Sequence, residues 1–238
     1  MPRIRTSRER RSEQFEVTKV IIAPEGISTE VDYFNGIVTY FKEYKGHVSK
    51  RFEQLIDVIK RGEFETEETD AQFAIGSSSP DAVVSYATSY IDKYHPEFDK
   101  DKDKVFIIID KDGWEDKKLS NALSLCKQKN YQLIISNPAF ELWLLLHFVD
   151  VSSLSHDKIL AIKNNEKETP KSQEAYLKVL LKSHIDGFSY TNLNADDFLP
   201  NTSIALVNAK RLDTPETGWE GGPFTQMPIV IESLPSIK

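Results

Sequence analysis

The sequence is poor in the features that mark several classes of protein. Its 238 residues contain one cysteine, Cys126, which excludes an internal disulfide framework and a cysteine zinc site. No apolar run approaches the roughly 20 residues that a membrane helix needs, and no apolar signal-peptide segment follows the N-terminus. No P-loop, GxGxxG motif or metal-ligand cluster of histidine and cysteine occurs, so no nucleotide site is signalled. We therefore expect a cytoplasmic protein without a membrane segment.

The charge balance limits the ways in which the chain could meet nucleic acid. A formal net charge of −7 argues against a protein that coats nucleic acid without specificity, although not against an enzyme that acts on it. Five arginines lie among the first eleven residues. Residues 1–15 could contact phosphates, but a flexible, solvated basic arm is the favoured interpretation.

The most informative stretch is KVFIIIDKDG at residues 104–113. Its apolar run predicts a strand buried on both faces, as in the middle of a parallel sheet. Because residues two apart in a strand point the same way, Asp110 and Asp112 can present both carboxylates at one spot. Paired carboxylates of this kind suit Mg²⁺ or Mn²⁺. The alternative is a strand that ends in a solvated acidic turn.

A third acid follows the first strand that the sequence predicts, which covers residues 16–24. Glu25 stands at the carboxyl end of that strand, the same kind of place as Asp110. Ser28 or Thr29 can then cap a helix that continues to about Phe41.

The remaining pattern indicates α/β architecture. Strands alternate with helices, which implies βαβ crossovers and a parallel sheet. Residues 46–73 are ambiguous between helix and strand, and 72–75 fit a short strand. Besides the elements above, we expect a helix from Pro80 to about Tyr94, a helix at about 119–130 and a strand at 131–136.

A fourth acid lies in the apolar segment that follows the strand at 131–136. Asn137 is a suitable N-cap and Pro138 a suitable first residue for a buried helix. Glu141 interrupts its apolar surface, and an unpaired buried carboxylate costs several kcal/mol. It is either a helix-dipole carboxylate or a member of the site, and the second is favoured. Cys126 and His147 are interpreted as core residues, with a metal role for His147 the less favoured alternative.

After Asp150 the composition turns polar. Helices are plausible around 157–162, 173–181 and 202–212, and residues 214–223 form a loop. We therefore predict a core at 16–150 and a mostly helical C-terminal extension at 151–238.

Three segments together resemble the RloB family: PEGISTE at 24–30 with Tyr33-Phe34, FIIIDKD at 106–112, and SNPAFELWLLLHF at 136–148. The last block is long and specific. The C-terminal part is similar only loosely, because GPFT at 222–225 stands where the family usually has N-P-x-T. Pro24 also departs from the family pattern, which usually leads into the Glu-Gly pair with cysteine or a small residue.

The resemblance implies a Toprim-like core, a small parallel sheet flanked by helices, related to that of OLD-type nucleases. In Toprim enzymes the glutamate, here Glu25, is the general acid/base, and the aspartates, here Asp110 and Asp112, hold Mg²⁺ during phosphodiester chemistry. RloB-like genes occur among restriction and antiphage-defence loci, often beside a gene for an ATPase. The resemblance thus implies nucleic acid as substrate and an ATPase as partner.

Our sequence-based hypothesis is a Mg²⁺- or Mn²⁺-dependent nuclease of prokaryotic defence. Glu25, Asp110, Asp112 and Glu141 are the expected catalytic residues, with Glu30 as a further metal ligand or an exposed-face glutamate. The alternative is a non-catalytic Toprim-like subunit that keeps a metal and docks to a partner or senses a ligand. RNA or DNA as substrate, and assembly into a homo-oligomer, stay open.

Overall fold

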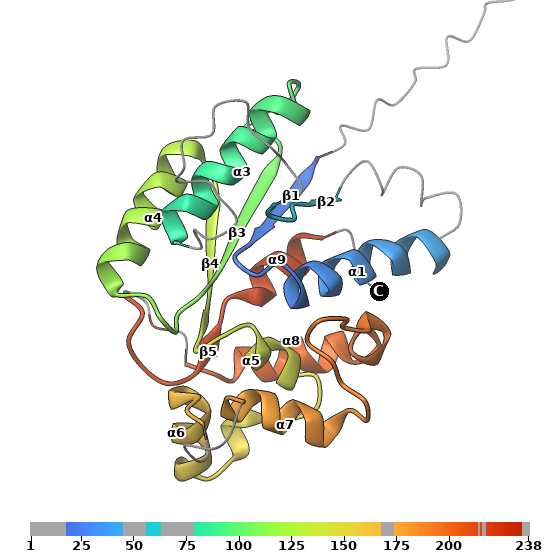
Figure 1. The fold of residues 1–238 in the computed structure, drawn as a ribbon, viewed down its shortest axis with the longest axis vertical. Coiled ribbons are helices and arrows are strands. Elements are labelled where there is room, and N and C mark those ends of the chain that lie inside the picture. Colours follow the sequence, from blue (N-terminus) through green and yellow to red (C-terminus); the bar gives the residue numbers. More distant parts are fainter. Residues whose placement is uncertain are drawn as a thin grey trace, which may run out of the picture.

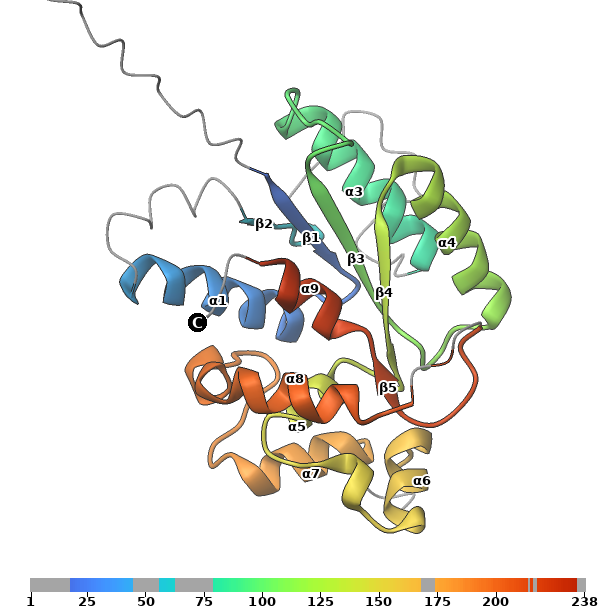
Figure 2. The same ribbon diagram turned by 180° about the vertical axis from the view of Figure 1, so that it is seen from behind.

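The computed structural model describes residues 18–44, 56–62, 79–167, 174–213, 215 and 218–234. The predicted arm at 1–15 and the possible strand at 72–75 lie outside these residues. The described chain forms an α/β fold, with a mostly parallel sheet, helices on both faces and a helical C-terminal region (Figure 1 and Figure 2). The predicted fold class is confirmed.

The sheet has five strands in the order β2-β1-β3-β4-β5. The first four are parallel, and β5 pairs antiparallel with β4 at one edge. The strands are β1 (Val20–Pro24), β2 (Ile56–Val58), β3 (Lys104–Asp110), β4 (Gln132–Asn137) and β5 (Phe224–Thr225). Of the ambiguous segment 46–73, residues 56–58 thus form a strand.

Side-chain alternation along the central strands divides the core into two layers. Ile21 and Ile107 belong to the apolar cluster on the side of α3 and α4, where Cys126 is also buried as predicted. Ile22 and Phe106 point into the opposite cluster, beneath α1 and α9. These helices are α1 (Thr29–Tyr44), α3 (Pro80–Tyr94), α4 (Asp116–Lys129) and α9 (Met227–Ser233). A strand with both faces covered must be apolar throughout, which explains the composition of β3.

The remaining helices gather at the carboxyl ends of the parallel strands, in the lower half of Figure 1. These helices are α5 (Glu141–Leu145), α6 (His156–Asn164), α7 (Tyr176–His184) and α8 (Thr202–Lys210). The helices predicted near 157–162, 173–181 and 202–212 correspond to α6, α7 and α8.

Two expectations for the chain around β4 are wrong: Asn137 as the N-cap of a helix, and Pro138 as its first residue. Asn137 is not the N-cap of a helix that begins at Pro138, because it is the last residue of β4 and pairs with Phe224. Its side-chain amide donates to the carbonyl of Gly222, and the Asn137–Pro138 peptide bond is cis. The helix begins only at Glu141. The partner strand β5 was not expected, because two residues are too few to give a strand pattern.

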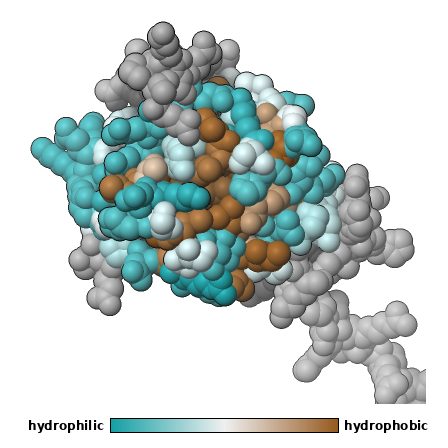
Figure 3. Space-filling model, turned by 90° about the horizontal axis from the view of Figure 1, so that it is seen from below, coloured by the Kyte–Doolittle hydropathy of each residue, from teal (hydrophilic) through white to brown (hydrophobic). Residues whose placement is uncertain are grey.

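None of the helices within the described residues is both long and apolar enough to cross a membrane. Figure 3 views the molecule from the side of α6 and α7 and shows an apolar band across that face. Four exposed large apolar side chains belong to the C-terminal region: Leu160 on α6, Ile204 and Val207 on α8, and Ile229 on α9.

His147 is a buried core residue with a defined tautomer. Its Nδ1 lies 3.0 Å from the carbonyl oxygen of Trp143, which can only accept, so Nδ1 carries the proton. Its Nε2 lies 3.3 Å from the hydroxyl of Tyr33, which donates to it. Burial lowers the pKa of His147 from 6.5 to about 4.

This burial predicts an acid-sensitive fold. Between pH 6.5 and 4 the unfolded chain protonates His147 and the folded chain does not, so stability falls as the pH falls. The loss through this group is on the order of 3 kcal/mol. Urea unfolding of the wild type and His147→Gln at pH 7.5, 6, 5 and 4 measures it. The wild type should lose that much more than the variant, and a difference independent of pH would contradict the assignment.

Candidate active site

The candidate site lies where the direction of the chain's crossovers reverses. From β1 the chain crosses to β2 on one side, and from β2 it returns past β1 to β3. The crevice at the carboxyl ends of β1 and β3 is therefore a topological switch point, the usual place for ligands in open α/β sheets. Glu25 follows β1 and Asp110 ends β3.

Asp110 is held by a backbone donor from the next strand-to-helix connection. The amide of Phe140, just before α5, donates to Asp110 Oδ1 at 2.8 Å. Asp112 lies two residues further, where its amide donates to the carbonyl of Pro138 at 2.9 Å. The two aspartates thus sit on one short extension of β3, with Asp112 at the exposed rim.

Glu25 is fixed at both carboxylate oxygens. The amide of Asp110 donates to Oε2 at 3.1 Å, and the indole Nε1 of Trp114 donates to Oε1 at 3.0 Å. The guanidinium of Arg61 donates to the backbone carbonyl of Glu25. With one donor on each of its two oxygens, the Glu25 carboxylate has a defined orientation.

Glu30 lies in the first turn of α1 and is 7% exposed, which excludes the exposed-face interpretation. Its carboxylate fills the space beside Gly26. A Cβ added at Gly26 would lie 1.9 Å from Glu30 Oε2. The glycine that follows Glu25 therefore leaves room for a second carboxylate.

Glu141 is the first residue of α5, and its side chain is 12% exposed. Its Oε1 lies 3.6 Å from Nζ of Lys178, a residue of α7. That ammonium also lies 4.6 Å from the centre of the Tyr190 ring, and the Tyr190 hydroxyl donates to the Lys178 carbonyl. A lysine from the C-terminal region thus reaches the acids of the core.

The structure brings all five predicted acids into one electrostatic group. Burial raises the pKa of Asp110 well above its usual range, and the charges of the other four acids add to the rise. Burial also raises the pKa of Glu30 to about 7, with Glu141 and Glu25 contributing. The pKa values of the other three are raised as well, chiefly by burial. We refer to these residues as the acid set: Glu25, Glu30, Asp110, Asp112 and Glu141.

The acid set fits a hard divalent cation in the chemistry of its donors. All five residues offer carboxylate oxygens, the ligands that Mg²⁺ and Mn²⁺ prefer, and a cation would relieve their mutual repulsion. Among the described residues, no three acidic, histidine or cysteine side chains are already arranged as a metal-ligand group. Binding a metal would therefore require some of these carboxylates to change rotamer.

Three polar residues of the site were not predicted from the sequence. Arg61 follows β2 and interacts electrostatically with Glu25 and Glu30. Lys178 comes from α7, and Asn165, after α6, hydrogen-bonds to the side chain of Asp112. Each belongs to a segment with no strand-end signal of its own, so only the tertiary fold could place it.

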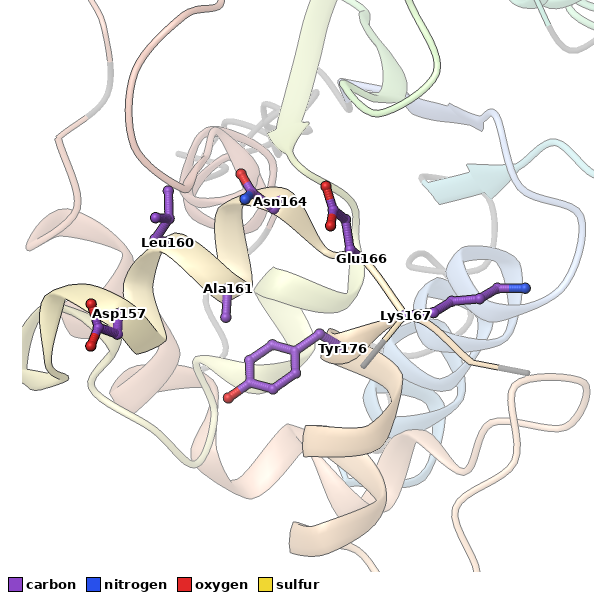
Figure 4. A pocket seen from close by; sticks show the side chains of 7 residues that line it. All are labelled: Asp157, Leu160, Ala161, Asn164, Glu166, Lys167 and Tyr176. Atoms are coloured by element: carbon purple, nitrogen blue, oxygen red, sulfur yellow. The ribbon is translucent and has the colours of Figure 1, made fainter. Parts of the chain in front are cut away.

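A hollow of about 420 Å³ lies apart from these acids, between α6 and the start of α7 (Figure 4). Leu160, Ala161 and Tyr176 form its apolar part, and it contains no member of the acid set. The site is therefore defined by the strand ends and not by this hollow.

The fold and the acid set define an α/β protein with a carboxylate site at the carboxyl ends of its parallel strands. A family model described as RloB-like protein matches residues 20–234, so the chain belongs to the RloB-like family. The resemblance seen in the sequence motifs is thereby confirmed. No curated protein and no solved structure matches the chain significantly.

The acid set predicts a pH-dependent stability in metal-free solution. The pKa of Glu30 is raised from 4.5 to about 7, so its carboxylate destabilises the fold as the pH rises through this window. Glu30→Gln keeps the acceptor oxygen and removes the charge. It should stabilise the metal-free protein by up to about 3 kcal/mol at pH 8 and by little at pH 4.5. Urea titrations in EDTA check this.

Asp186, an exposed carboxylate, provides the control. Asp186→Asn should change the free energy of unfolding by less than about 0.5 kcal/mol at either pH. A Glu30→Gln variant that is less stable than the wild type at pH 8 would contradict the repulsive role of Glu30.

Proposed function

We propose that this RloB-like protein is a Mg²⁺- or Mn²⁺-dependent nuclease that hydrolyses phosphodiester bonds in RNA or DNA. The observation that carries the proposal is the acid set itself. Five carboxylates are gathered at a topological switch point although burial raises the pKa of every one of them, and the charges of neighbouring acids add to the rise for all but Asp112. An arrangement that opposes folding in this way is expected where a cation binds.

The acids have distinct roles in this proposal. Asp110 and Asp112 would hold the ion, with Glu30 and Glu25 as further oxygen donors. A divalent ion held there would polarise a phosphoryl oxygen and stabilise the developing negative charge. Glu25, fixed by Trp114 and by the Asp110 amide, moves a proton to or from the attacking or leaving oxygen.

The two neighbouring cations complete the site. Lys178 contacts Glu141 and offers a positive charge to a phosphate that approaches the acids. Glu141 in turn holds that ammonium in place and contributes a further carboxylate next to Asp112. Arg61, after the neighbouring strand β2, supports Glu25 by donating to its backbone carbonyl.

The biological setting follows from the family resemblance. We propose that the nuclease acts in the cytoplasm, in prokaryotic antiviral or restriction-linked defence, together with an ATPase encoded nearby. Purified protein, with and without the neighbouring gene product, should be incubated with total RNA, plasmid and single-stranded DNA in Mg²⁺ or Mn²⁺. Intact substrates in every combination, together with metal binding at the acids, would favour a non-catalytic metal-binding subunit instead.

Metal binding should be visible as thermal stabilisation. A ligand that binds only the folded state at a hundredfold excess over its Kd stabilises it by about 2.7 kcal/mol. Mn²⁺ should therefore raise the melting temperature of the wild type. Asp110→Asn should remove most of that rise, because Asn keeps the acceptor for the Phe140 amide but not the charge. Asp186→Asn should respond like the wild type, and equal rises in all three proteins would refute the site.

The role of Glu25 can be separated from metal binding. Glu25→Gln keeps an oxygen that can accept from Trp114 and removes the proton-carrying function. Turnover should fall by about 10²–10⁴-fold, while most of the Mn²⁺-induced rise in melting temperature persists. Cleavage rates and melting curves of the same preparations decide this. Near-normal turnover in the variant would exclude Glu25 from the chemistry.

A further inference from the structure

A groove of about 360 Å³ opens beside the acid set. Four segments that are distant in the sequence line it. They are the β3–α4 loop at 111–115, the cis-proline turn at 137–138, the end of α6 through Lys163, and the loop at 219–220. Its volume is at the lower end of the range of about 300–1,000 Å³ that small-ligand sites occupy.

We propose that this groove binds one unpaired nucleotide of a single-stranded nucleic acid, with the base against Trp114 and a phosphate toward Lys163. The proposal rests on the nuclease function proposed above, and it identifies the form of the substrate: a single strand with an accessible base.

The aromatic wall of the groove is rigid. Trp114 is half-buried, and its indole Nε1 donates to Glu25 at 3.0 Å. Its backbone carbonyl accepts from Nζ of Lys111 at 3.1 Å. Trp219, only 9% exposed, also lines the groove, and both tryptophans pack against the apolar cluster beneath α3 and α4. A fixed indole beside an open groove is a surface on which any nucleobase can stack, without a preference for sequence.

The charges of the groove favour a single phosphate over a duplex backbone. Lys111 is already paired, at 3.1 Å from Asp116. Lys163 forms no ion pair or hydrogen bond with any residue that the structure describes, so its ammonium is available to a ligand. Asp112, Glu115 and Glu220 line the same groove and would repel a continuous row of phosphates. An apolar wall with one available cation therefore suits one nucleotide.

The groove and the acid set share Asp112 and are linked through Trp114, which places the bound nucleotide next to the reaction. Asp112 belongs to both, and the indole of Trp114 forms a wall of the groove while its Nε1 holds Glu25. A base stacked on Trp114 would thus lie beside the carboxylate that moves the proton. A duplex would have to expose an unpaired base to reach this position.

Direct binding without cleavage tests the proposal. Fluorescence anisotropy in EDTA would measure the Kd of the full-length protein for labelled 12-nucleotide probes. The probes are single-stranded RNA, single-stranded DNA of the same sequence, and the corresponding duplexes, at several salt concentrations. The expected result is tighter binding of single strands than of duplexes, and the two single-stranded probes identify which sugar is preferred.

Variants of the two groove residues separate stacking from charge. Trp114→Leu should weaken single-strand binding about fivefold or more, because it removes the stacking face. Trp114→Phe keeps a ring but loses the bond to Glu25, so binding should stay near wild type while cleavage falls. Lys163→Ala should lower the slope of log Kd against log salt by about 0.7, the value for one phosphate contact on a single strand. Lys158→Ala, an exposed lysine of the same helix outside the groove, should leave the slope unchanged.

The outcomes distinguish this inference from the proposed reaction. If both Trp114→Leu and Lys163→Ala keep the wild-type Kd and salt slope, the groove does not bind the nucleotide, even if the protein cuts nucleic acid. Equal affinity for duplexes and single strands would refute the requirement for an unpaired base. Binding as described without cleavage in Mg²⁺ or Mn²⁺ would support the groove and refute the nuclease.

Discussion

Electrostatic repulsion among buried carboxylates is the constraint on which the rest of this structure depends. Removing a carboxylate from water is unfavourable, and gathering several raises the cost further. The fold offsets part of it with directed donors: the amides of Asp110 and Phe140 and the indole of Trp114. Arg61, after β2, and Lys178, on α7, supply positive charge. The strand-end loops can therefore be understood as a frame that keeps acids close together.

This constraint also explains why the C-terminal region cannot be considered apart from the site. The Thr29 hydroxyl donates to the carbonyl of Tyr190, and Asp32 accepts from the amide of Leu193, so the start of α1 is tied to the chain before α8. Lys178 approaches Glu141 from α7. The division at residue 150 stays a prediction about the chain, but the acid site draws on residues from both sides of it.

The sequence was sufficient for those parts of the site that depend on local pattern. An apolar run that ends in acids identifies the end of a buried strand, and parallel strands bring their carboxyl ends to one edge, so Asp110, Asp112 and Glu25 could be placed together. Glu141 could be found because a lone carboxylate in an apolar segment needs a partner.

What the sequence could not predict depends on contacts between distant segments. Nothing local to Asn137 shows that Phe224 will pair with it as the last residue of β4, or that the helix will begin only at Glu141. In the sequence, Lys178 cannot be told apart from any other lysine of an amphipathic helix. Only the packing of α7 beside α5 brings it to Glu141. Arg61 lies in a segment whose pattern was ambiguous. In each case the deciding interaction joins residues far apart in the chain.

Gly26 is a residue whose role is local in the sequence but depends on a side-chain contact in the structure. In the sequence it is a residue of a turn after a strand, and a turn alone would explain it. In the structure its missing side chain is the space that the Glu30 carboxylate occupies. A side chain there would collide with that carboxylate, at 1.9 Å from Oε2, and force it to move. Glycine at this position therefore lets the Glu30 carboxylate stay within the acid set, where the charges of Glu25 and Glu141 raise its pKa.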